Sequence, residues 1–115
     1  MSSGSTLKLL LLAGITVAAG ASRVMAADDT EALLTARKCH ACHAVSENRL
    51  GPSYVAIAAK HSVMRSDALV EVLSRKIVAG GGGAWGNVPM VPNDHVSLDE
   101  ARRMTRWILE RRPGN

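Results

Sequence analysis

The chain has 115 residues, of which 14 are basic and 10 are acidic, and its formal net charge at pH 7 is +4. This length allows one small domain, and a core of that size usually needs a cofactor, a metal or disulfides as well. The sequence contains no Phe, and its large aromatic residues are Tyr54, Trp85 and Trp107. Few large side chains are therefore available to fill the centre, which excludes a large self-sufficient core.

Residues 1–26 have the pattern of an export signal rather than of a folded segment. A positively charged start precedes residues 9–21, an apolar stretch rich in Leu and Ala that is shorter than a usual membrane span. We expect cleavage after Ala26, with Ala27 as the alternative, and a mature domain over residues 27–115 in the periplasm. An uncleaved amino-terminal anchor is the other interpretation. Nucleic-acid binding is not expected of an exported chain without a recognition motif.

A first helix, capped at residues 28–30, is expected to run into the sequence Cys39-His40-Ala41-Cys42-His43. The spacing C-x-x-C-H is typical of covalent attachment of a c-type haem. Residues three apart lie on one helix face, so both cysteines can form thioethers with one porphyrin edge while His43 ligates the iron. A redox dithiol, half of a zinc site and a tight disulfide are the alternatives.

The rest of the chain alternates helices and loops, and no segment has the alternation of a strand. We expect helices at residues 53–60 and 67–78, and a last helix that starts at Ser97 with a capping box to Glu100. Residues 80–83 are four glycines, which either approach a flat ligand closely or form a flexible linker. The sequence thus predicts an all-α domain in which the helix before the cysteines packs against the last helix.

The second axial ligand of the haem decides between electron transfer and chemistry at an open iron site. The candidates are Met64, Met90, Met104, His61 and His95. Met104 falls in the apolar stripe of the last helix and is expected to pack in the core. Met90 lies in a loop stiffened by prolines, which can hold a thioether against iron at little ordering cost. We therefore favour Met90, with His95 as the second choice.

With these residues identified, the chain resembles the class I cytochromes c, and more narrowly the short bacterial group that serves nitrite reductases and terminal oxidases. The resemblance covers roughly residues 33–111. It rests on the C-x-x-C-H run, Gly51-Pro52-Ser53-Tyr54, Lys76-Ile77, residues 84–90, Pro92-Asn93, residues 99–101 and residues 107–109. The chain departs from the family at Val91, where a second proline often follows the methionine, and in its longer glycine run.

The resemblance implies about four helices wrapped around one covalent haem c. Cys39 and Cys42 would carry the thioethers, and His43 and Met90 would be the axial ligands. The Pro52 carbonyl would accept a hydrogen bond from the far ring nitrogen of His43, as metal-bound histidines usually require.

The same resemblance places Lys76 and Trp85 beside a haem propionate, and it lets Asn93 donate a hydrogen bond toward the Met90 sulfur. Ordinary core packing is an equally good interpretation for Trp85.

The leading functional hypothesis is a periplasmic electron carrier that is not an enzyme and passes one electron between respiratory redox proteins. Its expected partners are a reductase, an oxidase or a cytochrome complex. The protein is expected to be a monomer and to contact membranes only through these partners. Basic residues clustered near the C-terminus are either solvated helix faces or a patch that steers acidic partners. The alternatives are a haem subunit of a larger oxidoreductase complex and an open-site cytochrome that resembles a peroxidase or binds gases.

Overall fold

The computed structural model describes residue 4, residues 13–15 and residues 21–115. Most of the apolar stretch expected in an export signal lies outside these described residues. The described chain forms α1 (Ala21–Ala36), a short 3-10 turn η1 (Cys39–Ala41), α2 (Tyr54–Lys60), α3 (Asp67–Ala79) and α4 (Leu98–Leu109). The described part contains no strand, and its one isolated extended pair joins Gly81 to Met90. The prediction of an all-α fold is therefore confirmed.

Helix α1 begins earlier than the sequence suggested. We expected a helix start at residues 28–30, but the helix runs without interruption from Ala21 to Ala36. The segment before residue 28 is Ala-Ser-Arg-Val-Met-Ala-Ala, and Ala, Arg and Met are good helix formers. The cap expected at residues 28–30 was therefore wrong, and the expected cleavage point after Ala26 lies within this helix.

Serine side chains start the three helices that follow. Ser53, Ser66 and Ser97 each accept a hydrogen bond from the backbone N–H three residues later, which satisfies one of the free donors at a helix start. At α4 the Glu100 carboxylate also accepts a hydrogen bond from Ser97 N at 3.0 Å, which completes the predicted capping box. Local sequence alone thus fixes where α4 begins.

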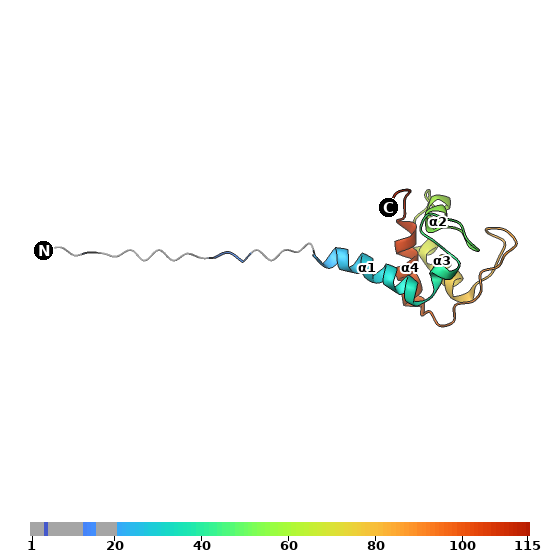
Figure 1. The fold of residues 1–115 in the computed structure, drawn as a ribbon, viewed down its shortest axis with the longest axis horizontal. Helices are drawn as coiled ribbons and strands as arrows, with labels where there is room; N and C mark the ends of the chain where they lie inside the picture. Colours follow the sequence, from blue (N-terminus) through green and yellow to red (C-terminus); the bar gives the residue numbers. More distant parts are fainter. Residues whose placement is uncertain (1–3, 5–12, 16–20) are drawn as a thin grey trace.

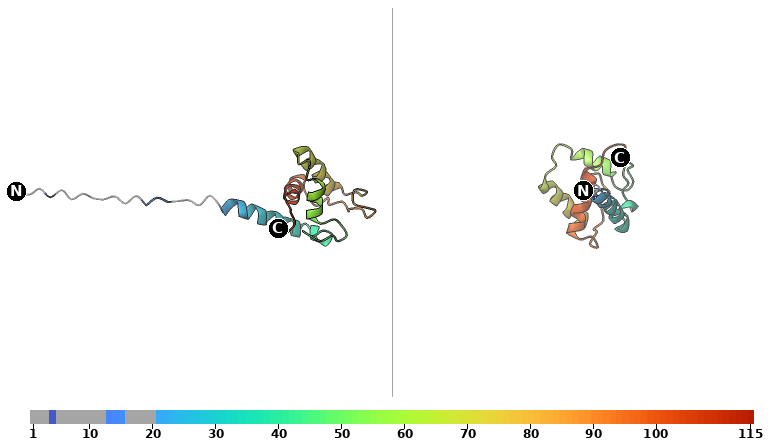
Figure 2. Two further views of the ribbon diagram at one scale, coloured as in Figure 1. Left: turned by 90° about the horizontal axis from the view of Figure 1, so that it is seen from above. Right: turned by 90° about the vertical axis from the view of Figure 1, so that its left-hand side faces the viewer.

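Helix α4 supplies most of the core. Its buried apolar residues are Ala101, Met104, Trp107, Ile108 and Leu109, and all but Leu109 pack in one cluster with Leu34, Tyr54 and Val96 from the rest of the chain. Helices α1, α2 and α3 all contact α4, and Figures 1 and 2 show α1 and α4 side by side although they lie far apart in the sequence. The predicted packing of the two terminal helices is therefore confirmed.

The two sides of α3 differ in how well the protein covers them. Val70 and Ser74 are buried, and the Ser74 hydroxyl donates a hydrogen bond to Val70 O at 2.6 Å and lies 3.1 Å from the Thr105 hydroxyl of α4, from which it can accept one. The apolar residues Leu69 and Leu73, by contrast, are only half-buried. A helix in such a small domain gains by burying all of its apolar side chains, so contact with an apolar cofactor on this second side would stabilise it.

Candidate haem site

The end of α1 carries the cysteine motif into a tight turn. Lys38 takes a left-handed backbone conformation, with φ 64° and ψ 24°, and the 3-10 turn Cys39–Ala41 follows it. The Cys39 carbonyl then accepts hydrogen bonds from Cys42 N at 3.2 Å and from His43 N at 3.0 Å. Both cysteines are free and half-buried. One turn of chain thus presents two thiols and one imidazole together.

His43 is held from several directions. Its Nδ1 lies 2.7 Å from Pro52 O, and because a carbonyl only accepts, Nδ1 must carry the proton. This is the hydrogen bond that the resemblance implied, and it leaves Nε2 with a free lone pair. The backbone of Gly51 lies directly against the ring, where a Cβ would overlap it. The His43 ring also stacks on Tyr54, with ring centroids 5.7 Å apart and planes at 22°.

Tyr54 links the cysteine turn to the core. It is 1% exposed, and its ring also contacts His40 and Trp107 edge-on at 5.7 Å. Its hydroxyl is buried and has no hydrogen-bond partner among the described residues. Burial raises the pKa of Tyr54, and the nearby Cys39 raises it further. Burial likewise raises the pKa of the Cys39 thiol, which is therefore protonated at neutral pH.

Met90 lies in the loop between α3 and α4, and its backbone is fixed by a pair of hydrogen bonds. Gly81 N donates to Met90 O at 2.9 Å, and Met90 N donates to Gly81 O at 2.9 Å. At the neighbouring Gly80, φ is 69° and a Cβ would come within 2.5 Å of Met90 O. The glycine run therefore works as a close backbone contact that positions Met90, and not as a flexible linker.

The Asn93 side chain makes other hydrogen bonds than the one that the resemblance implied. Its side-chain amide donates to Ile77 O at 3.0 Å and to Val91 O at 3.3 Å, rather than toward the Met90 sulfur. Its backbone N–H donates to Val78 O at 3.0 Å. The contacts with Ile77 and Val78 tie the loop after Met90 to the end of α3. Carbonyl oxygens are stronger acceptors than a thioether, which explains why the amide turns to them.

Trp85 is 47% exposed, and the cation beside its ring comes from α2. Lys60, the last residue of α2, places its Nζ 4.4 Å from the centre of the indole ring and donates to Ala84 O at 2.8 Å. Lys76 lies instead at the base of the loop, beside Gly81. Sequence reasoning missed Lys60, because it lies in another helix and no local pattern relates it to Trp85.

Three of the other candidate axial ligands are engaged elsewhere or exposed, and His61, at the end of α2, is half-buried. Met104 is fully buried in the core, and Met64 is 76% exposed. His95, the second choice, has its Nε2 3.2 Å from Arg37 O. The described residues contain no group of three or more His, Cys, Asp or Glu that could hold a metal ion, which argues against the zinc alternative.

The donor set fits a c-type haem. Two free thiols stand three residues apart, an imidazole has its Nδ1 proton committed and its Nε2 free, and a loop with a hydrogen-bonded base carries a thioether. The half-buried apolar residues of α3 offer a surface for a flat apolar group. A disulfide between the cysteines is not formed, and no βαβ unit surrounds them in the described chain, so the redox-dithiol alternative lacks its usual setting.

Known cytochromes c are similar to this chain over most of its length. Cytochrome c-551 of Pseudomonas aeruginosa is 39% identical over 103 residues, which is 90% of this chain and 92% of that protein. Cytochrome c-552 of Hydrogenobacter thermophilus is 40% identical over 85% of this chain and 86% of that protein. The crystal structure of Nitrosomonas europaea cytochrome c552 is similar with a TM-score of 0.67 and 36% identity, covering 71% of this chain and 99% of that one. No family model matches the chain.

Proposed function

The chain belongs to the cytochrome c-551 and c-552 family of class I cytochromes c, and from this premise we propose how its residues hold the haem and where it works. It is an electron-transfer protein with one covalently bound haem c, not an enzyme. When bound, the haem supplies an iron that cycles between the ferric and ferrous states. It acts with redox partner proteins, and the protein residues described above decide how the iron is held.

We propose that Cys39 and Cys42 form the two thioethers and that His43 Nε2 and the Met90 sulfur are the axial ligands. The observation that carries this assignment is the hydrogen bond between His43 Nδ1 and Pro52 O at 2.7 Å. A proton fixed on Nδ1 keeps Nε2 deprotonated, and contact with Gly51 and Tyr54 keeps the ring from rotating. A ligand with a fixed orientation costs little reorganisation when the charge on the iron changes.

Lys76 and Trp85 are proposed to face a haem propionate. Support comes from the exposure of Trp85 and from the place of Lys76 at the base of the loop that carries both Trp85 and Met90. A cation and an indole N–H would each satisfy part of a carboxylate that meets solvent.

We propose that the protein is exported, loses residues 1–26 and works as a free monomer in the periplasm. The charged start, the apolar stretch and the small residues at the cleavage point support export. The described chain contains no helix long and apolar enough to cross a membrane. Mass spectrometry of the periplasmic fraction should find a mature chain that begins at Ala27, and size-exclusion chromatography should give a monomer. Residues 1–26 retained in the membrane fraction would contradict the proposal.

The ligand assignment is tested by replacing Met90. Met90→Ala should remove the weak sulfur-to-iron charge-transfer band of the ferric protein, lower its reduction potential and let carbon monoxide bind the ferrous iron. Met64→Ala is the matched control, because Met64 is 76% exposed, and it should leave all three properties unchanged. An unchanged band in Met90→Ala, or strong carbon monoxide binding by the unaltered protein, would favour an open-site cytochrome instead.

A further inference from the structure

The loop that carries Met90 is exposed over nearly its whole length. Its base is closed by the hydrogen-bonded pair of Gly81 and Met90, and inside the loop Gly83 N donates to Gly86 O at 3.3 Å. Residues 82–89 are all exposed. Such a segment loses few buried contacts when it opens, so its opening free energy depends on the contacts that reach it from other elements.

Among the described residues, Lys60 at the end of α2 contacts the tip of this loop. Its ammonium donates to Ala84 O at 2.8 Å and stands 4.4 Å from the centre of the Trp85 ring. Both contacts use the positive charge, because a charged donor forms the stronger hydrogen bond and a cation is attracted to the face of the indole. Lys60 therefore joins the end of α2 to two successive residues of the loop.

We propose that Lys60 is a positioning residue that holds the Met90 loop closed and thereby keeps the Met90 sulfur on the iron. The inference rests on the proposed ligation by Met90. A loop closed at its base by Gly81 and at its tip by Lys60 moves as one unit, so release of the tip lowers the cost of moving Met90 away. Each opening exposes a coordination position, which a carrier that avoids side reactions must keep closed.

A control for this role must lose a positive charge without touching the haem or the loop. Lys76 does not qualify, because it is proposed to face a haem propionate and its side chain lies beside Gly81 at the base of the loop. Arg103 of α4 is exposed and has no role in the proposed haem site. A comparison of Lys60 with Arg103 therefore separates a clamp on the tip from a general effect of losing one positive charge.

The experiment uses the haem-loaded mature protein and its variants Lys60→Gln, Lys60→Arg and Arg103→Gln. Saturating imidazole displaces the methionine from ferric iron at a rate limited by loop opening, and the loss of the sulfur-to-iron band reports it. Lys60→Gln should raise this limiting rate about fivefold to tenfold, given the usual strength of one exposed cation–π contact and one charged hydrogen bond. Lys60→Arg should restore most of the original rate, because guanidinium also donates and stacks.

Hydrogen exchange gives a second readout that does not depend on the iron. The amides of Gly81 and Met90 should exchange several-fold faster in Lys60→Gln than in the unaltered protein, and Arg103→Gln should leave their exchange unchanged. An unchanged displacement rate with unchanged exchange in Lys60→Gln, or an equal effect in Arg103→Gln, overturns the inference. If the unaltered protein lacks the sulfur-to-iron band, the Met90 ligation itself is wrong, and exchange at Gly81 still decides whether Lys60 closes the loop.

Discussion

Lys38 has a backbone conformation that the sequence does not indicate. It has φ 64°, and it is the one described residue other than glycine with positive φ. The family resemblance found the neighbouring Cys39 and His43 through their motif, but nothing in a lysine indicates a left-handed backbone. The strain is visible only once α1 and the 3-10 turn are both in place.

Lys38→Gly should therefore stabilise the protein. Glycine adopts positive φ without steric cost, and the expected gain in the free energy of unfolding is about 1 kcal/mol. Lys38→Ala is the matched control, because it removes the same charge but keeps the Cβ, and it should give no comparable gain. Urea unfolding of the three proteins measures the difference. Equal stabilities for the glycine and alanine variants would mean that the turn carries no strain.

Gly80 should tolerate no side chain. A Cβ there would meet the Met90 and Pro92 backbones at 2.5 and 2.8 Å, and φ is 69°. Gly80→Ala is expected to destabilise the protein by about 2 kcal/mol and to weaken the sulfur-to-iron band, because the loop must shift. Gly83→Ala is the control, since Gly83 also has positive φ, at 94°, but no atom lies within 4 Å of its Cβ position. That variant should lose stability while keeping the band.

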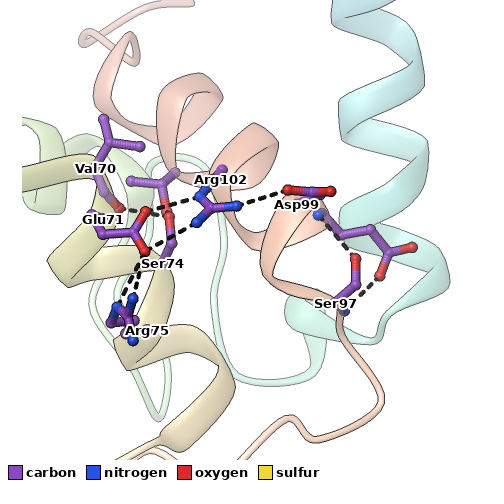
Figure 3. Close-up of polar contacts among 9 residues, drawn as sticks. Val70, Glu71, Ser74, Arg75, Ser97, Asp99 and Arg102 are labelled. Carbon is purple, nitrogen blue, oxygen red and sulfur yellow. Dashed lines mark hydrogen bonds and ion pairs between the residues drawn. The ribbon is translucent and has the colours of Figure 1, made fainter. Parts of the chain in front are cut away.

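At the scale of the elements, ion pairs join helices that lie far apart in the sequence. Figure 3 shows Arg102 of α4 reaching Glu71 of α3 at 2.8 Å and Asp99 of its own helix at 2.7 Å. Arg37, just after α1, reaches Glu100 of α4 at 2.6 Å. The sequence predicted the serine cap of α4 because capping is local. It could not predict these pairs, because partners tens of residues apart depend on how the helices pack.

The Arg37–Glu100 ion pair should make the stability of the protein depend on pH. The side-chain hydrogen bond from Arg37 lowers the pKa of Glu100 below its ordinary value. A carboxylate with a lower pKa in the folded state contributes stability above its unfolded pKa, about 4.3, and this contribution is lost as pH falls through the lower folded value. The unfolding midpoint should therefore drop as pH is lowered below about 4.3.

Glu100→Gln tests this origin. It keeps a side-chain oxygen for the capping hydrogen bond to Ser97 N but loses the charge that pairs with Arg37. The variant should be less stable at pH 7 and should lose less stability in acid. Glu110→Gln is the control, because its carboxylate is 72% exposed and lies 4.0 Å from Arg111. If both variants keep the acid sensitivity of the unaltered protein, Arg37–Glu100 is not its source.

At the scale of the whole molecule, the fold was predictable because the apolar residues of its helices follow a regular helical spacing. The helical spacing of apolar residues in α3 and α4, and the apolar positions before Cys39, correctly indicated an all-α domain with paired terminal helices. The long connections were not predictable in the same way. Loop contacts such as that of Lys60 with Trp85 depend on backbone paths through glycines, and these paths have no periodic signature.

The haem should be needed for the full stability of the domain. The protein alone leaves Leu69 and Leu73 of α3 half-buried, and a domain this small gains much from a covalent staple. A Cys39→Ala/Cys42→Ala variant, expressed with the haem-attachment machinery, should lack covalent haem and show less helix by circular dichroism with a lower midpoint. Met90→Ala keeps the thioethers and should stay close to the unaltered helix content. A double variant that is as helical and as stable without haem would contradict this.

Helix α4 has a consequence for the order in which the protein matures. In the proposed export the N-terminus crosses the membrane first, so the cysteine turn reaches the periplasm before α4, which supplies Ala101, Met104, Trp107, Ile108 and Leu109 to the core. Until α4 emerges, Leu34 and Tyr54 lack most of the side chains that cover them. A partly exported chain therefore lacks the cover of its attachment site, and export in this order would leave both thiols accessible while the haem is attached.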